Sequence, residues 1–326
     1  MEGLTHRLYH TAPRTVAWRT EPLGRPAAGS VSVRTTLSAL SGGTEGLFFR
    51  GDVDEGTDLD PHLQGLSGKA CYPFRYGYCL CGVVNALGAG VAPEWLHRRV
   101  FAFEPHCSSF HAPISTLHPI PDELDDRRAV FFPLAETAAT LVLDASPRWK
   151  EKAVVFGLGP LGALTAGLLS DFPLESLDLR DQLPGRQLRV RNWIGGEDSG
   201  ASSDFDLAFD LGGTPGSLAA AVKALGFGGR LILGSWQGRD LLIPGAGAEF
   251  HRKRLETITS QVSTLAPGMT ARWTMERRTK QVWDTLRHWP VEQLISHELP
   301  HDQAQTAFEN LQQKKDDVFQ VVLTYD

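Results

Sequence analysis

Six consecutive residues in the middle of the chain, 157–162, carry the clearest chemical signature: Gly-Leu-Gly-Pro-Leu-Gly. They follow the apolar run 153–156 and precede leucines at helical spacing, so the pattern predicts a strand, a glycine turn and a helix. In such a turn the glycines permit the tight bend, the approach of backbone amides to a pyrophosphate, and close helix packing. The alternative is an ordinary glycine-rich turn of another α/β unit. We expect dinucleotide contacts from Gly157, Gly159, Pro160, Leu161 and Gly162.

An acidic residue ends the next predicted strand, at the place where a dinucleotide site needs one. Asp181 lies 22 residues after Gly159, close to the offset of about 20 residues at which a carboxylate binds the hydroxyls of the adenosine ribose. Asp178 is the alternative, but it lies in mid-strand between two leucines. Arg180 and Arg186 are candidates to bind a 2′-phosphate. Both NAD and NADP therefore stay open as cofactors.

Length and composition indicate a globular protein of more than one domain. The 326 residues exceed the size at which a single core stops growing, and a hydrophobic share of 42% with 33 glycines and 20 prolines is typical of a globular chain with many turns. A net charge of −6 argues against nucleic-acid or anionic-membrane partners. The short basic runs 252–254 and 277–278 are expected to be solvated helix faces. With no long apolar run and no signal-peptide core, we expect a cytoplasmic protein acting on a small molecule.

The cysteines do not indicate a metal centre or a disulfide framework. None forms a C-x-x-C pair or a zinc-binding quartet, and Cys79 and Cys81 would share one face of a strand as buried small side chains. A metal site built from His106, Cys107 and His111 is a weaker alternative, because no carboxylate or further histidine spacing supports it. The four cysteines are Cys71, Cys79, Cys81 and Cys107.

The order of patterns along the chain predicts an α/β protein with a separate β-rich part. Short β patterns fill residues 1–121, and strands alternate with helices across 122–266, which is typical of a doubly wound parallel sheet. Residues 182–196 are an exception, because they contain a proline, three glycines and no clean helical period. Residues 267–326 end in an amphipathic stretch and a strand, and we expect them to rejoin the first domain.

This order, together with the glycine run, resembles the medium-chain dehydrogenase/reductase superfamily over essentially the whole chain. The segments 41–48, 73–78, 248–251 and 260–263 resemble the branch that includes bacteriochlorophyllide dehydrogenase-like oxidoreductases. The resemblance implies a GroES-like β-rich catalytic domain, a doubly wound Rossmann domain that binds NAD or NADP, and a homodimer. It does not assign the chlorophyll substrate to this chain.

The sequence departs from the zinc-dependent members of that superfamily at two ligand positions. Those members carry a cysteine just before a Gly-Thr/Ser-Asp segment, and the corresponding run here, 42–45, has glycine in the ligand's place. Their Gly-His-Glu segment reads Gly77-Tyr78-Cys79. Because a catalytic zinc needs three protein ligands, we expect no zinc.

Without zinc, another group must handle the proton that accompanies a hydride. Thr44 matches the hydroxyl that relays protons in zinc-containing relatives, and Tyr78 takes the place of the missing histidine, unless it is only a packed aromatic ring. Glu136 lies near where relatives approach the nicotinamide, with a helix-terminal charge or a buried salt bridge as alternatives. Glu45 and His106 are weaker candidates, the first expected to be structural and the second an exposed loop residue.

These features favour a zinc-independent NAD(P)-dependent oxidoreductase. It would transfer a hydride between nicotinamide and an alcohol or ketone of a sizeable, partly apolar substrate, in secondary metabolism. One alternative is NADPH-dependent reduction of an activated double bond, as in enoyl and quinone reductases. The other is a protein that binds the cofactor without catalysis.

Overall fold

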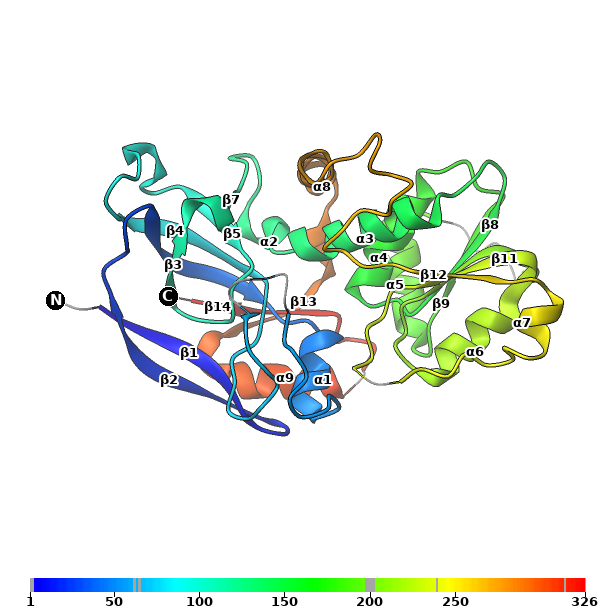
Figure 1. The fold of residues 1–326 in the computed structure, drawn as a ribbon, viewed down its shortest axis with the longest axis horizontal. Helices are drawn as coiled ribbons and strands as arrows, with labels where there is room; N and C mark the ends of the chain where they lie inside the picture. The colour runs from blue at the N-terminus through cyan, green and yellow to red at the C-terminus, as the bar shows by residue number, and fades with distance from the viewer. Residues whose placement is uncertain are drawn as a thin grey trace. The chain divides into compact units, whose positions relative to one another are not determined.

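The computed structural model describes residues 3–60, 63, 66–196, 203–238, 240–313 and 315–325. The chain divides into two compact units (Figure 1). Unit 1 contains Met1–Pro133, Trp283–Lys314 and Gln320–Asp326, and unit 2 contains Leu134–Val282 and Lys315–Phe319. Each unit is therefore assembled from segments that are distant in sequence.

Unit 1 is rich in β-strands, as predicted. Strands β1 (Gly3–Ala12) and β2 (Thr15–Gly24) form an antiparallel pair, blue in Figure 1. The other described strands form one sheet in the order β13-β14-β3-β4-β5-β7, with β6 also paired to β3. Only β13 and β14 pair in parallel within it. The strands of this sheet are β3 (Ser30–Ala39), β4 (Leu80–Leu87), β5 (Arg99–Ala102), β6 (Ser109–Pro113), β7 (His118–Pro119), β13 (Ile295–Pro300) and β14 (Gln320–Thr324).

Unit 1 also contains a buried apolar core and several short helices. A buried apolar cluster that includes Val33, Leu80, Val100 and Phe110 lies between its strands. On β6 the buried Phe110 and Ala112 alternate with more exposed residues, so one face of that strand is turned to this core. Strand β5 is buried on both faces, because Val100, Phe101 and Ala102 are all buried. The helices are α1 (Thr44–Arg50), α2 (Asp126–Ala129) and α9 (Ala304–Gln312), with 3₁₀ turns at Pro93–Trp95, Ile114–Thr116, Val291–Leu294 and His301–Gln303.

Unit 2 contains a five-stranded sheet, counted over the described residues, in the order β9-β8-β10-β11-β12, with every pair parallel. The chain runs outward from β8 first to β9 and then, in the other direction, to β10, β11 and β12. Such a reversal of strand order is where doubly wound sheets bind their ligands. The strands are β8 (Lys152–Phe156), β9 (Ser176–Arg180), β10 (Phe205–Asp210), β11 (Leu225–Leu233) and β12 (Glu256–Thr259). The helices are α4 (Pro160–Ser170), α5 (Pro184–Ile194), α6 (Pro215–Ala224) and α7 (Glu249–Arg252), while α3 (Phe132–Ala145) and α8 (Met275–His288) span the divisions between the units in sequence.

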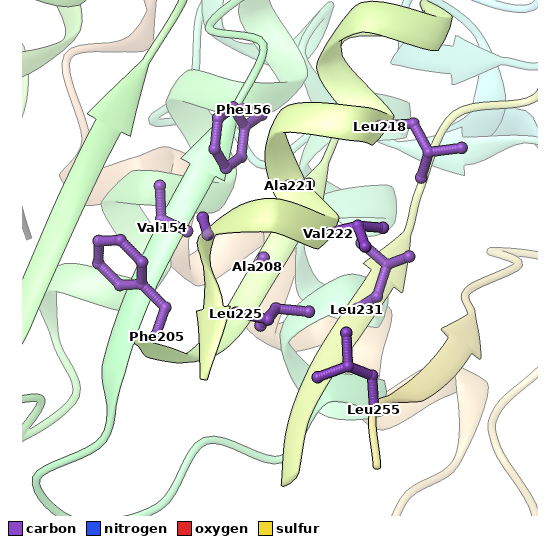
Figure 2. Close-up of a cluster of buried hydrophobic side chains, with 11 residues drawn as sticks. Val154, Phe156, Phe205, Ala208, Leu218, Ala221, Val222, Leu225, Leu231 and Leu255 are labelled. Atoms are coloured by element: carbon purple, nitrogen blue, oxygen red, sulfur yellow. The ribbon is translucent and has the colours of Figure 1, made fainter. Parts of the chain in front are cut away.

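Helix α6 covers one face of this sheet (Figure 2). It begins at a capping box in which the side chains of Thr214 and Ser217 each bond the other's backbone N–H. Leu218, Ala221 and Val222 then point toward the strands, at the spacing of one helical face. Each buried Leu or Val of this kind contributes about 1.5–3 kcal/mol of stability. The packing fixes the sheet that carries the glycine turn.

Helix α5 was not expected from the sequence, because residues 182–196 show no helical periodicity. Its stability comes from its ends and from tertiary contacts: Leu183 N–H donates to Asp181, and Gly195 ends the helix in the left-handed conformation. The segment 315–319 adds two bonds, from Gly185 N–H to Asp316 and from the Arg186 guanidinium to the Val318 carbonyl. The lack of an apolar stripe in residues 182–196 therefore did not exclude a helix there. The edge strand β12 was also absent from the prediction.

His10 on β1 is a fully buried imidazole in unit 1. Its ring stacks on Phe74, with centroids 5.2 Å apart, and meets the edge of Phe308 at 5.4 Å. Neither ring nitrogen has a hydrogen-bond partner among the described residues. Burial, with a smaller contribution from His106, lowers the pKa of His10 from its ordinary 6.5 to about 3.

This burial predicts a loss of stability in acid. The unfolded chain protonates His10 below about pH 6.5, whereas the folded chain resists protonation until about pH 3, so stability falls as the pH drops through this window. At pH 4.5 the loss amounts to about 3 kcal/mol. Urea unfolding of the wild type and of His10→Phe at pH 7 and pH 4.5 measures it, and the wild type should lose more stability on acidification. Equal losses in both proteins would contradict the assignment.

Candidate functional site

The glycine turn of unit 2 leaves room for a ligand at one position and fills the other two with protein. Gly157 has a φ of +89°, and a Cβ added there would lie 2.4 Å from the Gly212 nitrogen. A Cβ on Gly162 would lie 2.0 Å from the Gly157 carbonyl oxygen. A Cβ on Gly159, by contrast, would meet no atom within 4 Å. Two of the glycines are therefore required by packing, and the third faces open space.

Helix α4 starts at this open position. Gly159 is its N-cap residue, no side chain caps the helix there, and Pro160 occupies the first turn. The first amides of a helix have no partner within the helix, and their dipoles favour a bound anion. This arrangement fits a pyrophosphate, which needs both close backbone approach and N–H donors.

The Asp181 side chain is hydrogen-bonded to the backbone of the glycine turn. Its Oδ2 accepts a hydrogen bond from Leu158 N–H at 2.6 Å, and its Oδ1 accepts one from Leu183 N–H at 2.9 Å. The carboxylate therefore lies beside the space next to Gly159, where the sequence predicts a ribose. The residues present fit a dinucleotide, because the start of α4 can bind phosphate and the Asp181 carboxylate can accept hydrogen bonds from sugar hydroxyls.

The two arginines considered for a 2′-phosphate are engaged elsewhere. Arg180 pairs with Asp178 at 3.2 Å and lies over the ring of Phe205, with its guanidinium carbon 5.1 Å from the centroid. The Arg186 guanidinium donates to the Val318 carbonyl oxygen at 3.0 Å. Asp181 is thus the charged side chain that the structure places on the turn itself.

In unit 1 the structure brings Thr44 and Tyr78 together. Thr44 begins α1, and Tyr78 precedes β4 in sequence. The side-chain hydroxyls of Thr44 and of Ser41, a residue that the sequence did not single out, lie close enough to the Tyr78 phenol to lower its pKa. We call Ser41, Thr44 and Tyr78 the hydroxyl cluster. Burial raises the pKa of Tyr78 above its ordinary value, the charge of Glu45 adds to the rise, and the two hydroxyls oppose it.

A buried acid and a buried histidine lie next to this cluster. Glu45 Oε2 and His106 Nε2 are 2.8 Å apart, and both side chains are fully buried. Glu45 Oε1 accepts the Ser41 N–H at 2.9 Å. His106 is therefore not an exposed loop residue, and that expectation was wrong. Because 61 residues separate the two in sequence, no local pattern could have joined them.

Glu136 lies in unit 2, in a buried ion pair. Its Oε1 is 3.2 Å from Arg278 Nη2 and also accepts the Thr279 hydroxyl at 3.2 Å. Burial raises the pKa of Glu136, although Arg278 opposes the rise. The expectation that 277–278 is a solvated face is wrong for Arg278, which is 2% exposed. The guanidinium can be buried because the Glu136 carboxylate pairs with it. The salt-bridge interpretation of Glu136 therefore has a specific partner.

The described residues do not fit a catalytic zinc. Nowhere in the described part of the chain do three or more His, Cys, Asp or Glu side chains gather as a metal site would require. Cys79 and Cys81 are buried, as expected for small core side chains, and the Cys79 thiol donates to the Val130 carbonyl oxygen.

Comparison with known proteins supports the fold. No family model matches the chain. L-Threonine 3-dehydrogenase from Stenotrophomonas maltophilia is 24% identical over 216 residues, which cover 62% of this chain and 60% of that enzyme, so the chain spans less than two thirds of this relative. An alcohol dehydrogenase from Escherichia coli CFT073, crystallised with NADH, superposes with a TM-score of 0.76 at 17% identity, covering 99% of each chain. Acetophenone reductase from Geotrichum candidum, in complex with NAD, gives 0.75 at 14% identity, covering 98% of this chain and 97% of that enzyme.

The chain therefore shares the fold of these dehydrogenases and reductases, with a GroES-like β-rich domain and a Rossmann domain, as predicted. Every helix in the described residues is too short or too polar to span a bilayer.

Proposed function

We propose that this chain is an NAD(P)-dependent oxidoreductase that works without zinc. The observation that carries the proposal is the glycine turn, where open space beside Gly159 adjoins a carboxylate bonded to the turn at Leu158. The similarity to L-threonine 3-dehydrogenase and the fold shared with NADH- and NAD-bound dehydrogenases support it. When bound, the nicotinamide would supply or accept a hydride.

We further propose that the cofactor is NAD rather than NADP. Asp181 can accept hydrogen bonds from both ribose hydroxyls, whereas its negative charge would repel a phosphate at the 2′ position. Arg180 and Arg186, which could have offset that repulsion, already pair with Asp178 and with the Val318 carbonyl.

Calorimetric titration with NAD⁺, NADH, NADP⁺ and NADPH tests this choice. NADH should bind more tightly than NADPH, and Asp181→Ala should weaken NADH binding about tenfold, or about 1.4 kcal/mol, while NADPH binding improves. Asp171→Ala, at the exposed end of α4, is the matched control and should change neither affinity. Equal affinities in the wild type would contradict the NAD assignment, and no binding of any of the four would overturn the proposed function.

The hydroxyl cluster can supply the proton that accompanies the hydride. A phenol with the ordinary tyrosine pKa of 10 is protonated at neutral pH, and burial raises the pKa of Tyr78 further, so it can donate to an oxygen that gains negative charge during reduction. The hydroxyls of Ser41 and Thr44 lie close to the phenol, and we propose that they orient its proton. Glycine at the expected cysteine position and tyrosine at the histidine position support a reaction without metal assistance.

The surroundings of Tyr78 support a partly apolar substrate. Tyr78 is partly buried against an aromatic cluster that includes Phe48, Phe74 and Tyr76. Its ring meets that of Tyr76 edge-on, with centroids 6.2 Å apart. These rings are buried themselves and give the phenol apolar surroundings, and on that ground we infer a ketone or secondary alcohol attached to a hydrophobic group. A homodimer and a role in secondary metabolism are proposals that rest on the family resemblance.

Removing one hydroxyl tests the proton donor. Tyr78→Phe should lower kcat for NADH-dependent reduction of a panel of aryl and aliphatic ketones about 100-fold, with unchanged NADH affinity. Tyr72→Phe is the control, because Tyr72 belongs to the same aromatic surroundings but donates to the Phe48 carbonyl. Comparable rates for Tyr78→Phe and wild type would exclude the phenol as donor. Enones in the same panel separate carbonyl from double-bond reduction.

A further inference from the structure

A chain of four buried polar side chains crosses the core of unit 1. Ser38 Oγ lies 2.8 Å from His106 Nδ1 and 3.0 Å from the Tyr325 hydroxyl, and His106 Nε2 lies 2.8 Å from Glu45 Oε2. Ser38, Glu45 and His106 are fully buried, and Tyr325 is 8% exposed. Burying a carboxylate and an imidazole costs free energy, and the hydrogen bonds among these four side chains offset that cost.

The bonds of Glu45 determine how the protons are arranged. One carboxylate oxygen accepts from the Ser41 backbone N–H, and the other faces His106 Nε2. A carboxylate can only accept, so Nε2 carries a proton. His106 Nδ1 then accepts from the Ser38 hydroxyl when the imidazole is neutral. Both ends of the Glu45 carboxylate are thus held in place.

His106 also contacts the backbone that precedes Tyr78. Gly77 has a φ of +131°, and a Cβ added there would lie 2.7 Å from His106 Cδ2 and 2.9 Å from His106 Nε2. The imidazole therefore packs directly against the peptide that leads into Tyr78. This contact is independent of the hydrogen bond to Glu45.

The pair of Glu45 and His106 consequently touches both segments that carry the hydroxyl cluster. Glu45 holds Ser41 by its N–H and directly follows Thr44, while His106 packs on Gly77. We propose that Glu45 and His106 are positioning residues that hold Ser41, Thr44 and Tyr78 in one arrangement, and their effect on turnover rests on the proposed function.

Four variants and a control separate this role from a general contribution to folding. Glu45→Ala and His106→Leu remove the contacts. Glu45→Gln keeps an acceptor for the Ser41 N–H, and His106→Gln keeps a side-chain N–H that can point to Glu45. Glu104→Gln is the matched control, because Glu104 is a carboxylate of the same unit that pairs with Arg75 at 3.5 Å, whereas the Ser41 N–H donates to Glu45.

The first measurement needs no substrate. Nuclear magnetic resonance spectra, with Tyr78 signals assigned through Tyr78→Phe, should show faster amide exchange at Ser41 and shifted Tyr78 ring signals in Glu45→Ala and His106→Leu. Glu104→Gln should leave both unchanged. Wild-type signals at Ser41 and Tyr78 in both contact-removing variants would overturn the proposal, even if the protein binds no NADH and the proposed function itself fails.

The second measurement uses the ketone panel with NADH. Glu45→Ala and His106→Leu should lower kcat at least tenfold with unchanged NADH affinity, because a small misplacement of a donor is costly. Glu45→Gln and His106→Gln should recover part of the rate. If the contact-removing variants do not fold, the two Gln variants are compared with Glu104→Gln, and intermediate rates support the proposal. Rates equal to those of Glu104→Gln in all folded variants would overturn it.

Discussion

Replacing Gly159 by valine should abolish dinucleotide binding and leave the fold intact. A Cβ at this position meets no protein atom within 4 Å, so the new side chain occupies the space that the phosphates need. We expect the Kd for NADH to rise at least about 100-fold, or about 2.7 kcal/mol. Calorimetric titration measures the affinity, and the thermal midpoint should stay close to that of the wild type.

Gly162→Val is the matched control for this experiment. Its Cβ would lie 2.0 Å from the Gly157 carbonyl oxygen, so this variant should lower the thermal midpoint because the turn itself must move. Both variants replace glycine by valine, three residues apart. Comparing them distinguishes a side chain that blocks a ligand from a side chain that disrupts the protein's own packing. NADH binding by Gly159→Val with wild-type affinity would refute a cofactor site at this turn.

Arg278→Met should destabilise unit 2 strongly. The methionine keeps much of the apolar volume, but it leaves Glu136 buried without its cation and removes the donors to Thr140 and to the Val262 carbonyl. Breaking a buried pair in this way costs about 3–5 kcal/mol. For a unit of this size the thermal midpoint should fall by roughly 10 °C, measured by calorimetry.

A double variant shows whether the loss comes from the pair. Glu136→Gln together with Arg278→Met removes both charges and should recover part of the stability lost in Arg278→Met alone. Glu136→Gln by itself also addresses catalysis, because the amide can still accept from Arg278 and Thr279. A lower kcat at unchanged thermal midpoint would assign Glu136 to the reaction, whereas a lower midpoint at unchanged kcat would assign it to structure. Additive losses in the double variant would argue against direct coupling of the two side chains.

The sequence predicted the features that depend on neighbouring residues. The turn 157–162 is one continuous run between a strand and a helix, and Asp181 directly follows the next strand, so strand and helix periodicity suffices to place them. Helix α5 escaped the same reasoning because contacts with Asp316 and Val318, more than 130 residues away, stabilise it.

Two buried charged groups escaped prediction for related reasons. The pairing of Glu45 with His106 exists only once helix α1 and the loop between β5 and β6 come together, and neither residue lies in a periodic pattern. Arg278 did leave a signal, because it shares one face of α8 with the buried Val282 and Leu286 at intervals of four residues. A charge on an apolar helical face indicates a buried partner.

The place of β14 also constrains the order in which the chain acquires structure during synthesis. This strand lies between β13 and β3 in the sheet of unit 1, yet the whole sheet of unit 2 precedes it in sequence. On a ribosome the strands β8 to β12 emerge as a consecutive set and can pair before β14 exists. Until it emerges, the end of β3 at residues 37–39 exposes an edge that can pair with another chain. Nascent chains stalled between β12 and β14 should therefore be a preferred substrate for chaperones.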